Sequence, residues 1–110
     1  MHLERKFEPF NSQTINAEFR TVPVEDRIRL MFAMQNFQDG IDGGYVVKSY
    51  GSGLQMIKAT NHSSGRGLFF YSHVVNGVQI CRLVLVYKKE ATEVPAHVLA
   101  TARRRMEQSR

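Results

Sequence analysis

The 110-residue sequence has no tryptophan and only one cysteine, Cys81. Cys81 lies within an apolar run and has no partner among these residues, so an internal disulfide is excluded. Disulfide-rich proteins belong to oxidising compartments, and we therefore expect a cytoplasmic protein. His62 and His73 have no zinc-ligand spacing with Cys81, so the sequence predicts no metal site, and Cys81 is read as a small buried apolar residue.

Apolar runs long enough to span a membrane are also missing. No segment approaches the ~20 apolar residues of a membrane-spanning helix, and charged residues 4–6 interrupt any signal-peptide pattern. Carboxylates are sparse outside the predicted helices, which argues against a hydrolase with paired carboxylates. No Ser-His-Asp or Cys-His arrangement is recognisable. With 43% hydrophobic residues, we expect one soluble domain over residues 1–110, with no membrane partner and no cofactor.

Acidic residues are outnumbered by basic ones. Ten Asp and Glu stand against 15 Lys and Arg, giving a net charge of +5 and an isoelectric point near 9.7. This balance favours a polyanionic partner, either a nucleic acid or an acidic protein. Many small soluble domains are basic without binding nucleic acid, so charge alone identifies no function.

Two apolar runs dominate the second half of the sequence. Residues 68–75 and 78–87 are rich in β-branched and aromatic residues, and Asn76-Gly77 between them suits a type I′ turn, which predicts a β-hairpin. Pro95 then predicts the start of a helix. Leu99, Ala102 and Met106 fall on one face of this helix, while residues 103–105, all arginines, point mostly elsewhere.

The remaining elements alternate with glycine-rich or proline-marked breaks. They are predicted in chain order as a short edge strand over 2–10, a helix that begins at 11–12 and ends before 22, a helix over 23–37, a loop over 38–44, a segment over 45–50 that could be extended, and a strand over 54–60. The order is β-α-α-β-β-β-α. It predicts an α+β domain with a small antiparallel sheet and the helices on one face.

Three ordered segments carry a family resemblance. Gly53-Leu54-Gln55-Met56-Ile57-Lys58 is similar to a Gly-Leu-x-Glu-Leu-Arg strand, and Arg66 before Leu68-Phe69-Phe70-Tyr71 is similar to an Arg-Val-x-Tyr strand. Val86-Tyr87-Lys88-Lys89, followed by Pro95, Ala102 and Arg104, is similar to a Phe-x-Lys-Lys, Thr-Pro, Ala-x-x-Arg ending. Together they resemble the RelE/ParE superfamily of toxins from toxin–antitoxin modules, closest to its HigB-like, phage-derived branch. Met56, Lys58 and Val94 depart from the usual acid, arginine and threonine.

The resemblance implies a strongly twisted sheet and a toxin that cleaves mRNA without metal, usually on the ribosome. It also implies inhibition by a tightly bound antitoxin, for which we expect a helix-turn-helix protein. The reaction would be attack of a ribose 2′-OH on the adjacent phosphodiester, which needs cations and proton-transfer groups. Two alternatives remain: a ParE-like inhibitor of DNA gyrase, and a non-catalytic basic binding module derived from a toxin.

The candidate residues are those that can neutralise a phosphate, move a proton or stack on a base. The catalytic candidates are Lys58, Arg66, Tyr71, Arg82, Tyr87 and His62, and the RNA-binding candidates are Lys88, Lys89 and Arg104. Consecutive strand residues face opposite ways, so at most one of Lys88 and Lys89 is expected to face substrate. Each candidate can also have no functional role and be simply an exposed cation, a tyrosine at the edge of the core or a solvated loop histidine.

Overall fold

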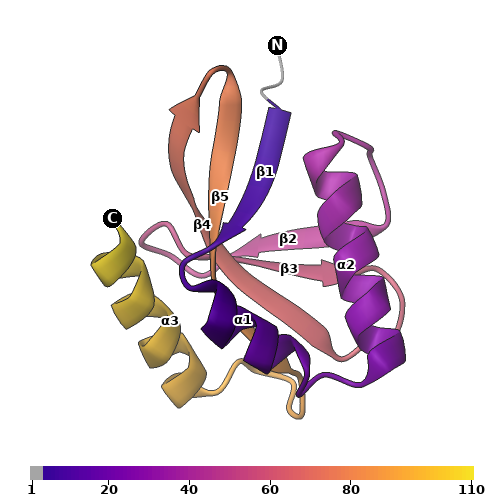
Figure 1. The fold of residues 1–110 in the computed structure, drawn as a ribbon. Coiled ribbons are helices and arrows are strands. Elements are labelled where there is room, and N and C mark those ends of the chain that lie inside the picture. The colour runs from indigo at the N-terminus through magenta and orange to yellow at the C-terminus, as the bar shows by residue number, and fades with distance from the viewer. Residues whose placement is uncertain (1–3) are drawn as a thin grey trace.

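The computed structural model describes residues 4–110 and has the predicted α+β class (Figure 1). It contains three helices and one five-stranded sheet. In chain order the elements are β1 (Glu4–Pro9), α1 (Ser12–Phe19), α2 (Val24–Gln38), β2 (Tyr45–Ser49), β3 (Gln55–Ala59), β4 (Gly65–Val75), β5 (Val78–Lys88) and α3 (Ala96–Ser109). No helix among the described residues is long and apolar enough to cross a membrane.

The sheet has the strand order β1-β5-β4-β3-β2 and is mixed. Strands β2, β3, β4 and β5 pair antiparallel with one another, whereas β1 runs parallel to β5 with Phe7 opposite Cys81. The prediction of a purely antiparallel sheet was therefore wrong, and β2 is an additional strand. A short turn forces antiparallel pairing only between the two strands that it joins. Helices α1 and α2 separate β1 from β2, so β1 can pair in parallel with β5 at the opposite edge of the sheet. His2 and Leu3 of the predicted first strand lie outside the described residues.

The predicted hairpin is confirmed as β4 and β5. Asn76 and Gly77 have φ values of 51° and 78°, as a type I′ turn requires, and Val75 lies opposite Val78. The register of this pair shifts twice, between Leu68 and Phe69 and again between Tyr71 and His73. Such bulges bend a strand pair and re-aim its side chains. The ribbon accordingly bends so that its tip extends beyond the helices (Figure 1).

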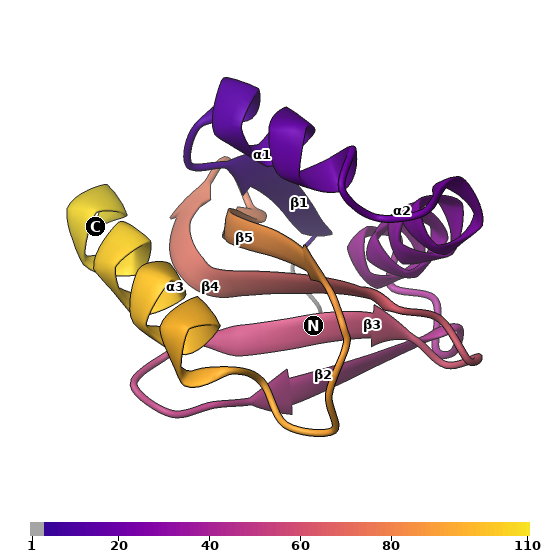
Figure 2. The same cartoon turned by 90° about the horizontal axis from the view of Figure 1, so that it is seen from below.

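The helices cover both faces of the sheet. Helices α1 and α2 lie on one face and α3 lies on the other (Figure 2). Ile15, Leu30 and Phe37 pack with Phe69 on the first face, whereas Ala102 and Met106 of α3 belong to a separate cluster with Leu68, Phe70 and Val84. The prediction of helices on one face was wrong because β3 to β5 bury apolar residues on both sides. Consecutive Phe69 and Phe70, 0% and 4% exposed, show this directly.

The helix starts follow the predicted signals. Asn11 Oδ1 accepts a hydrogen bond from Thr14 N at 2.9 Å and caps α1, and α2 and α3 begin directly after Pro23 and Pro95. Asp26 in the first turn of α2 also reaches the segment that precedes β4. This contact links the helical layer to the start of β4, close to where basic side chains gather.

Candidate functional site

Three strands bring basic and phenolic side chains to one place on the α3 face of the sheet. Lys58 lies two residues beyond buried Met56, and Arg66 lies two residues before buried Leu68, so strand alternation places both on this face. Tyr87 is the cross-strand partner of Arg66. They line a cavity of about 200 Å³, which we call the Arg66 pocket, together with Lys48, Tyr50, Lys89 and the wall formed by residues 91–94.

Arg66 is the fixed cation of this pocket. It is 6% exposed, and its Nη1 donates hydrogen bonds to the carbonyl oxygens of Ser63 at 2.6 Å and Gly65 at 3.0 Å. Burial lowers the pKa of Arg66, an effect that the nearby Tyr87 and Tyr50 oppose, and an arginine remains cationic at neutral pH. Among residues 4–110, no carboxylate lies within ion-pair distance of Arg66. Carbonyl dipoles therefore hold the guanidinium without an ion-pair partner, while Asp26 acts on it from a longer range and Glu93 lines the same pocket.

The segment that holds Arg66 is tied down on two sides. Ser64 Oγ donates to Asp26 Oδ2 at 2.5 Å, and the backbone N–H of Lys89 donates to Ser64 O at 2.7 Å. The hydrogen bond from Ser64 is the main cause of the lowered pKa of Asp26. Gly65 is required here, since a Cβ at this position would lie 3.0 Å from Asp26 O and 3.2 Å from Leu30 Cβ. These contacts fix the orientation of Arg66.

Two tyrosines border the guanidinium. Burial is the main cause of the raised pKa of Tyr87, Tyr50 raises it further, and Arg66 opposes both. The Tyr87 phenol is therefore protonated at neutral pH and can donate a proton. Lys48 Nζ lies 5.4 Å from the ring centroid of Tyr50, and Arg103 Nη2 donates to Tyr50 O at 2.9 Å.

Sequence reasoning missed Lys48 and Tyr50 as site residues. They belong to the segment that was read only as possibly extended, and no family motif covers it. The alternation of Val46, Lys48 and Tyr50 was the available signal, because residues two apart on a strand share a face. Their closeness to Arg66 depends on the pairing of β2 with β3.

An outer cavity of about 650 Å³ adjoins the Arg66 pocket and shares Lys58, Arg66 and Lys89 with it. His62 is exposed and lines this outer cavity. The structure thus gathers His62, Lys58, Arg66, Tyr87 and Lys89 around two adjoining spaces. These groups can neutralise a phosphate and exchange protons with it, which is the chemistry expected of them from the sequence.

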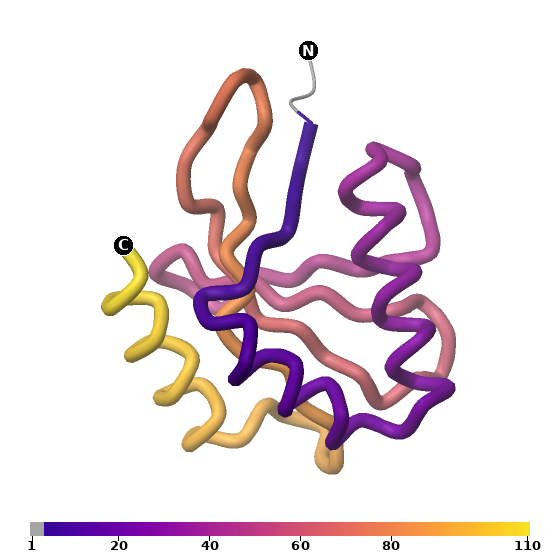
Figure 3. The backbone as a smooth tube through the Cα atoms, viewed as in Figure 1, coloured from indigo at the N-terminus to yellow at the C-terminus, as the bar shows by residue number. Residues whose placement is uncertain are grey.

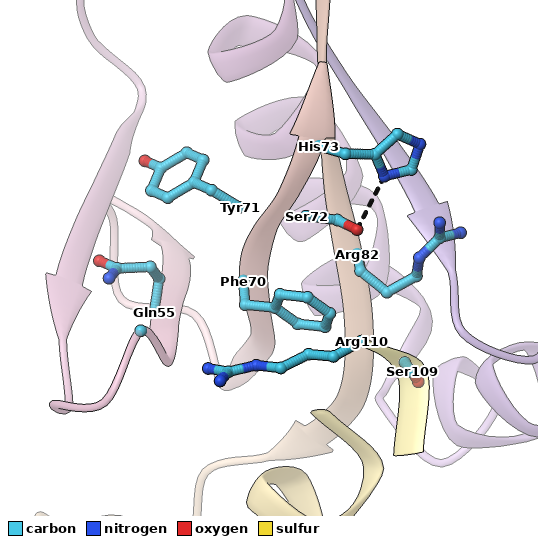
Figure 4. A pocket seen from close by; sticks show the side chains of 9 residues that line it. Gln55, Phe70, Tyr71, Ser72, His73, Arg82, Ser109 and Arg110 are labelled. Atoms are coloured by element: carbon cyan, nitrogen blue, oxygen red, sulfur yellow. Dashed lines mark hydrogen bonds between the residues drawn. The ribbon is translucent and has the colours of Figure 1, made fainter. Parts of the chain in front are cut away.

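Arg82 does not belong to this group. It lies opposite Phe70 on β4, which is four residues, or roughly 13 Å, from Arg66 along the strand. Its Nη1 forms an ion pair with Glu8 Oε1 of β1 at 3.3 Å. Arg82 instead lines a separate cavity of about 560 Å³, which we call the Arg82 pocket, with residues that include Gln55, Phe70, His73 and Arg110 (Figure 4).

The other candidates are dispersed. The Tyr71 ring points away from the Arg82 side of β4 and contacts Phe69 edge-on at 5.5 Å (Figure 4). Lys88 and Lys89 are both exposed, and only Lys89 lines the two cavities near Arg66. Arg104 is exposed on α3 and lines neither named pocket. The structure therefore does not bring Tyr71, Lys88 or Arg104 to the Arg66 pocket.

Cys81 is fully buried, and burial raises its pKa to about 11. Among residues 4–110, no three His, Cys, Asp or Glu side chains gather closely enough to hold a metal ion. Comparison of the sequence with protein-family models and with curated proteins finds no match. The functional assignment therefore depends on the geometry and chemistry of the Arg66 pocket.

Proposed function

We propose that this protein is a HigB-like toxin of the RelE/ParE type that cleaves mRNA on the ribosome. The observation that carries the proposal is the meeting of Lys58, Arg66 and Tyr87 from three strands in one pocket. Among the described residues, no carboxylate lies within ion-pair distance of either Lys58 or Arg66. A phosphate entering the pocket would form the ion pairs that these two cations lack.

The proposed reaction transfers the phosphorus from one ribose oxygen to another. The 2′-oxygen attacks the adjacent phosphorus, and the bond from phosphorus to the 5′-oxygen breaks. Arg66 and Lys58 stabilise the charge that develops on the non-bridging oxygens. Protonated Tyr87 gives its proton to the leaving 5′-oxygen, and His62 in the outer cavity accepts the proton of the 2′-OH.

The distribution of charge supports a polyanionic substrate on this side of the molecule. Residues 45–110 contain ten basic and three acidic residues, whereas residues 11–44 contain three basic and five acidic residues. The basic excess therefore lies in the strands and α3 that surround the pocket, away from α1 and α2. The element order, with two helices before the antiparallel strands and one helix after them, also supports the RelE/ParE assignment.

The same assignment includes a protein partner. An antitoxin of the helix-turn-helix kind would inhibit the toxin by covering the Arg66 pocket, and acidic side chains on it would neutralise the exposed cations. Toxin, antitoxin, mRNA and ribosome would meet in the cytoplasm. Expression of the chain alone should arrest bacterial growth, and co-expression of the adjacent small gene should relieve the arrest.

The direct test is to add the purified chain to a cell-free translation reaction and map mRNA 5′ ends by primer extension. We expect discrete, ribosome-dependent cuts that disappear in a Lys58→Ala, Arg66→Ala variant. The matched control is Arg20→Ala, Arg29→Ala, which removes two exposed cations from the opposite layer. Intact mRNA with folded protein would contradict the proposal, and a DNA gyrase supercoiling assay would then test the other activity of the superfamily.

A further inference from the structure

The Arg82 pocket has no part in the proposed reaction, yet it opens on the same face of the sheet. Its volume is about 560 Å³, and Phe70, 4% exposed, forms part of its lining. Figure 4 shows Phe70, His73 and Arg82 on one side of the β4–β5 ribbon, with Arg110 reaching across from the end of α3. The lining combines the Phe70 ring with polar side chains, and its two arginines each have a carboxylate partner, so the space differs from a phosphate site.

The guanidinium and imidazole groups of this pocket are planar and already have partners. Arg82 pairs with Glu8, Arg110 pairs with Glu107 at 3.6 Å, and His73 Nδ1 lies 2.9 Å from Ser72 Oγ. The two carboxylates offset the arginine charges and lower the attraction for a free phosphate. The guanidinium and imidazole planes remain available, and such planes stack on the bases of single-stranded RNA.

A line of arginines connects the two pockets. Arg103 donates to the carbonyl of Tyr50, which lines the Arg66 pocket, and Arg110 donates to Ser52 O at 3.2 Å. The two arginines lie two helical turns apart, roughly 10 Å, on the side of α3 that faces the β2–β3 connection. The backbone trace shows this connection beside the C-terminal end of α3 (Figure 3). A few nucleotides of extended strand would bridge this distance.

We propose that the Arg82 pocket binds a base of the same RNA strand whose phosphate is cut in the Arg66 pocket. The inference rests on the proposed function for the identity of the substrate as RNA. The base stacks on the His73 and arginine planes, and the Gln55 amide, which also lines the pocket, is placed to bond its edge. The base that occupies the pocket is therefore a source of sequence preference a few nucleotides from the cut.

The test uses a fluorescein-labelled hexanucleotide of 2′-O-methyl RNA, which cannot be cleaved, and fluorescence anisotropy. An abasic residue is placed at each position in turn. We expect the wild type to lose affinity about tenfold at one position, the size of a single stacking interaction. In a His73→Ala, Arg110→Ala variant the intact oligonucleotide should bind about tenfold more weakly, and the abasic residue should cause no further loss.

The matched control is His97→Ala, Arg29→Ala, which removes one exposed imidazole and one exposed guanidinium outside the pocket. It should retain the position-specific effect. Equal affinities for all abasic oligonucleotides, or an unchanged abasic effect in the His73→Ala, Arg110→Ala variant, would overturn the base pocket even if mRNA cleavage occurs. A position-specific loss in a protein that never cleaves mRNA would support the base pocket and reject the nuclease.

Discussion

The Arg66 and Arg82 pockets lie on one face of one sheet, but their arginines are held by different kinds of partner. Arg66 donates to two backbone carbonyls and has no ion-pair partner among residues 4–110, whereas Arg82 pairs with the Glu8 carboxylate. Carbonyl dipoles hold a guanidinium in place without cancelling its charge, and a carboxylate cancels it. An arginine of the first kind keeps its charge for an anionic ligand, whereas one of the second kind mainly offers its guanidinium plane.

Strand topology causes the difference. Glu8 reaches Arg82 because β1 runs parallel to β5, with residue 8 opposite residue 82. β1 ends at Pro9, opposite Leu83, so it supplies no side chain near the other end of β5 where Tyr87 and Arg66 pair. There the connection between β3 and β4 holds Arg66 through the Ser63 carbonyl, and Asp26 and Glu90 line the adjoining outer cavity without forming an ion pair with it.

The largest difference between the pockets should appear on replacing each arginine with glutamine. Arg66→Gln should lower the single-turnover cleavage rate by about 10²–10³, because it removes charge stabilisation at the phosphate. Arg82→Gln should weaken RNA binding and change the rate at saturating RNA by much less. Thermal unfolding of both variants controls for the burial of Arg66. Equal losses of rate in the two folded variants would contradict the division of roles.

A second comparison uses the two tyrosines whose pKa is raised by burial. Tyr87→Phe should reduce cleavage by about 10²-fold, because it removes the proton donor to the leaving oxygen. Tyr71→Phe makes the same change at a tyrosine that lines the Arg82 pocket and not the Arg66 pocket, and it should leave the rate unaltered. RNA affinity should be similar in both variants. A Tyr87→Phe enzyme with full rate would show that another group protonates the 5′-oxygen.

The raised pKa of Tyr87 can be measured from the ultraviolet absorbance of its phenolate. The absorbance titration of Tyr87→Phe is subtracted from that of the wild type. The midpoint should lie above 10 and should rise further in Arg66→Gln, since Arg66 lowers this pKa, but not in Arg82→Gln. The folded state binds the phenolic proton more tightly than the unfolded state. Its contribution to stability is therefore complete below pH 10 and is lost as pH rises through the folded value. A midpoint at or below 10 would exclude a buried phenol.

The smallest effect is expected from removing the counter-charge of Arg82. Glu8→Gln should raise RNA affinity at low salt by less than about fivefold, the scale of a partly exposed ion pair. It should also steepen the salt dependence of RNA binding, by the amount expected for about one additional phosphate contact. The control is Glu4→Gln, an exposed carboxylate on the same strand. Identical salt slopes for Glu8→Gln and wild type would mean that Arg82 stays unavailable to phosphate even without its partner.

The site was predictable only where a motif and a strand end coincided. Lys58, Arg66, Tyr87 and Lys89 were all identified from the sequence, and the structure brings them together because β3 and β5 end where β4 begins, at one end of the sheet. Arg82 and Tyr71 lie in the same predicted strands, but register and alternation place them elsewhere. Lys48 and Tyr50 were missed because their segment carries no motif and joins the site only through strand pairing.

The sequence by itself determined the local structure of this protein. The Asn76-Gly77 turn, the helix starts after Pro23 and Pro95 and the α+β class all follow from neighbouring residues, since turn chemistry and hydrophobic period act over a few positions. The tertiary structure alone decided that β1 runs parallel to β5, that α3 covers the second face, and that Arg82 has a carboxylate partner while Arg66 has none. Those features depend on contacts between residues as far apart as Glu8 and Arg82, for which local sequence patterns carry no register.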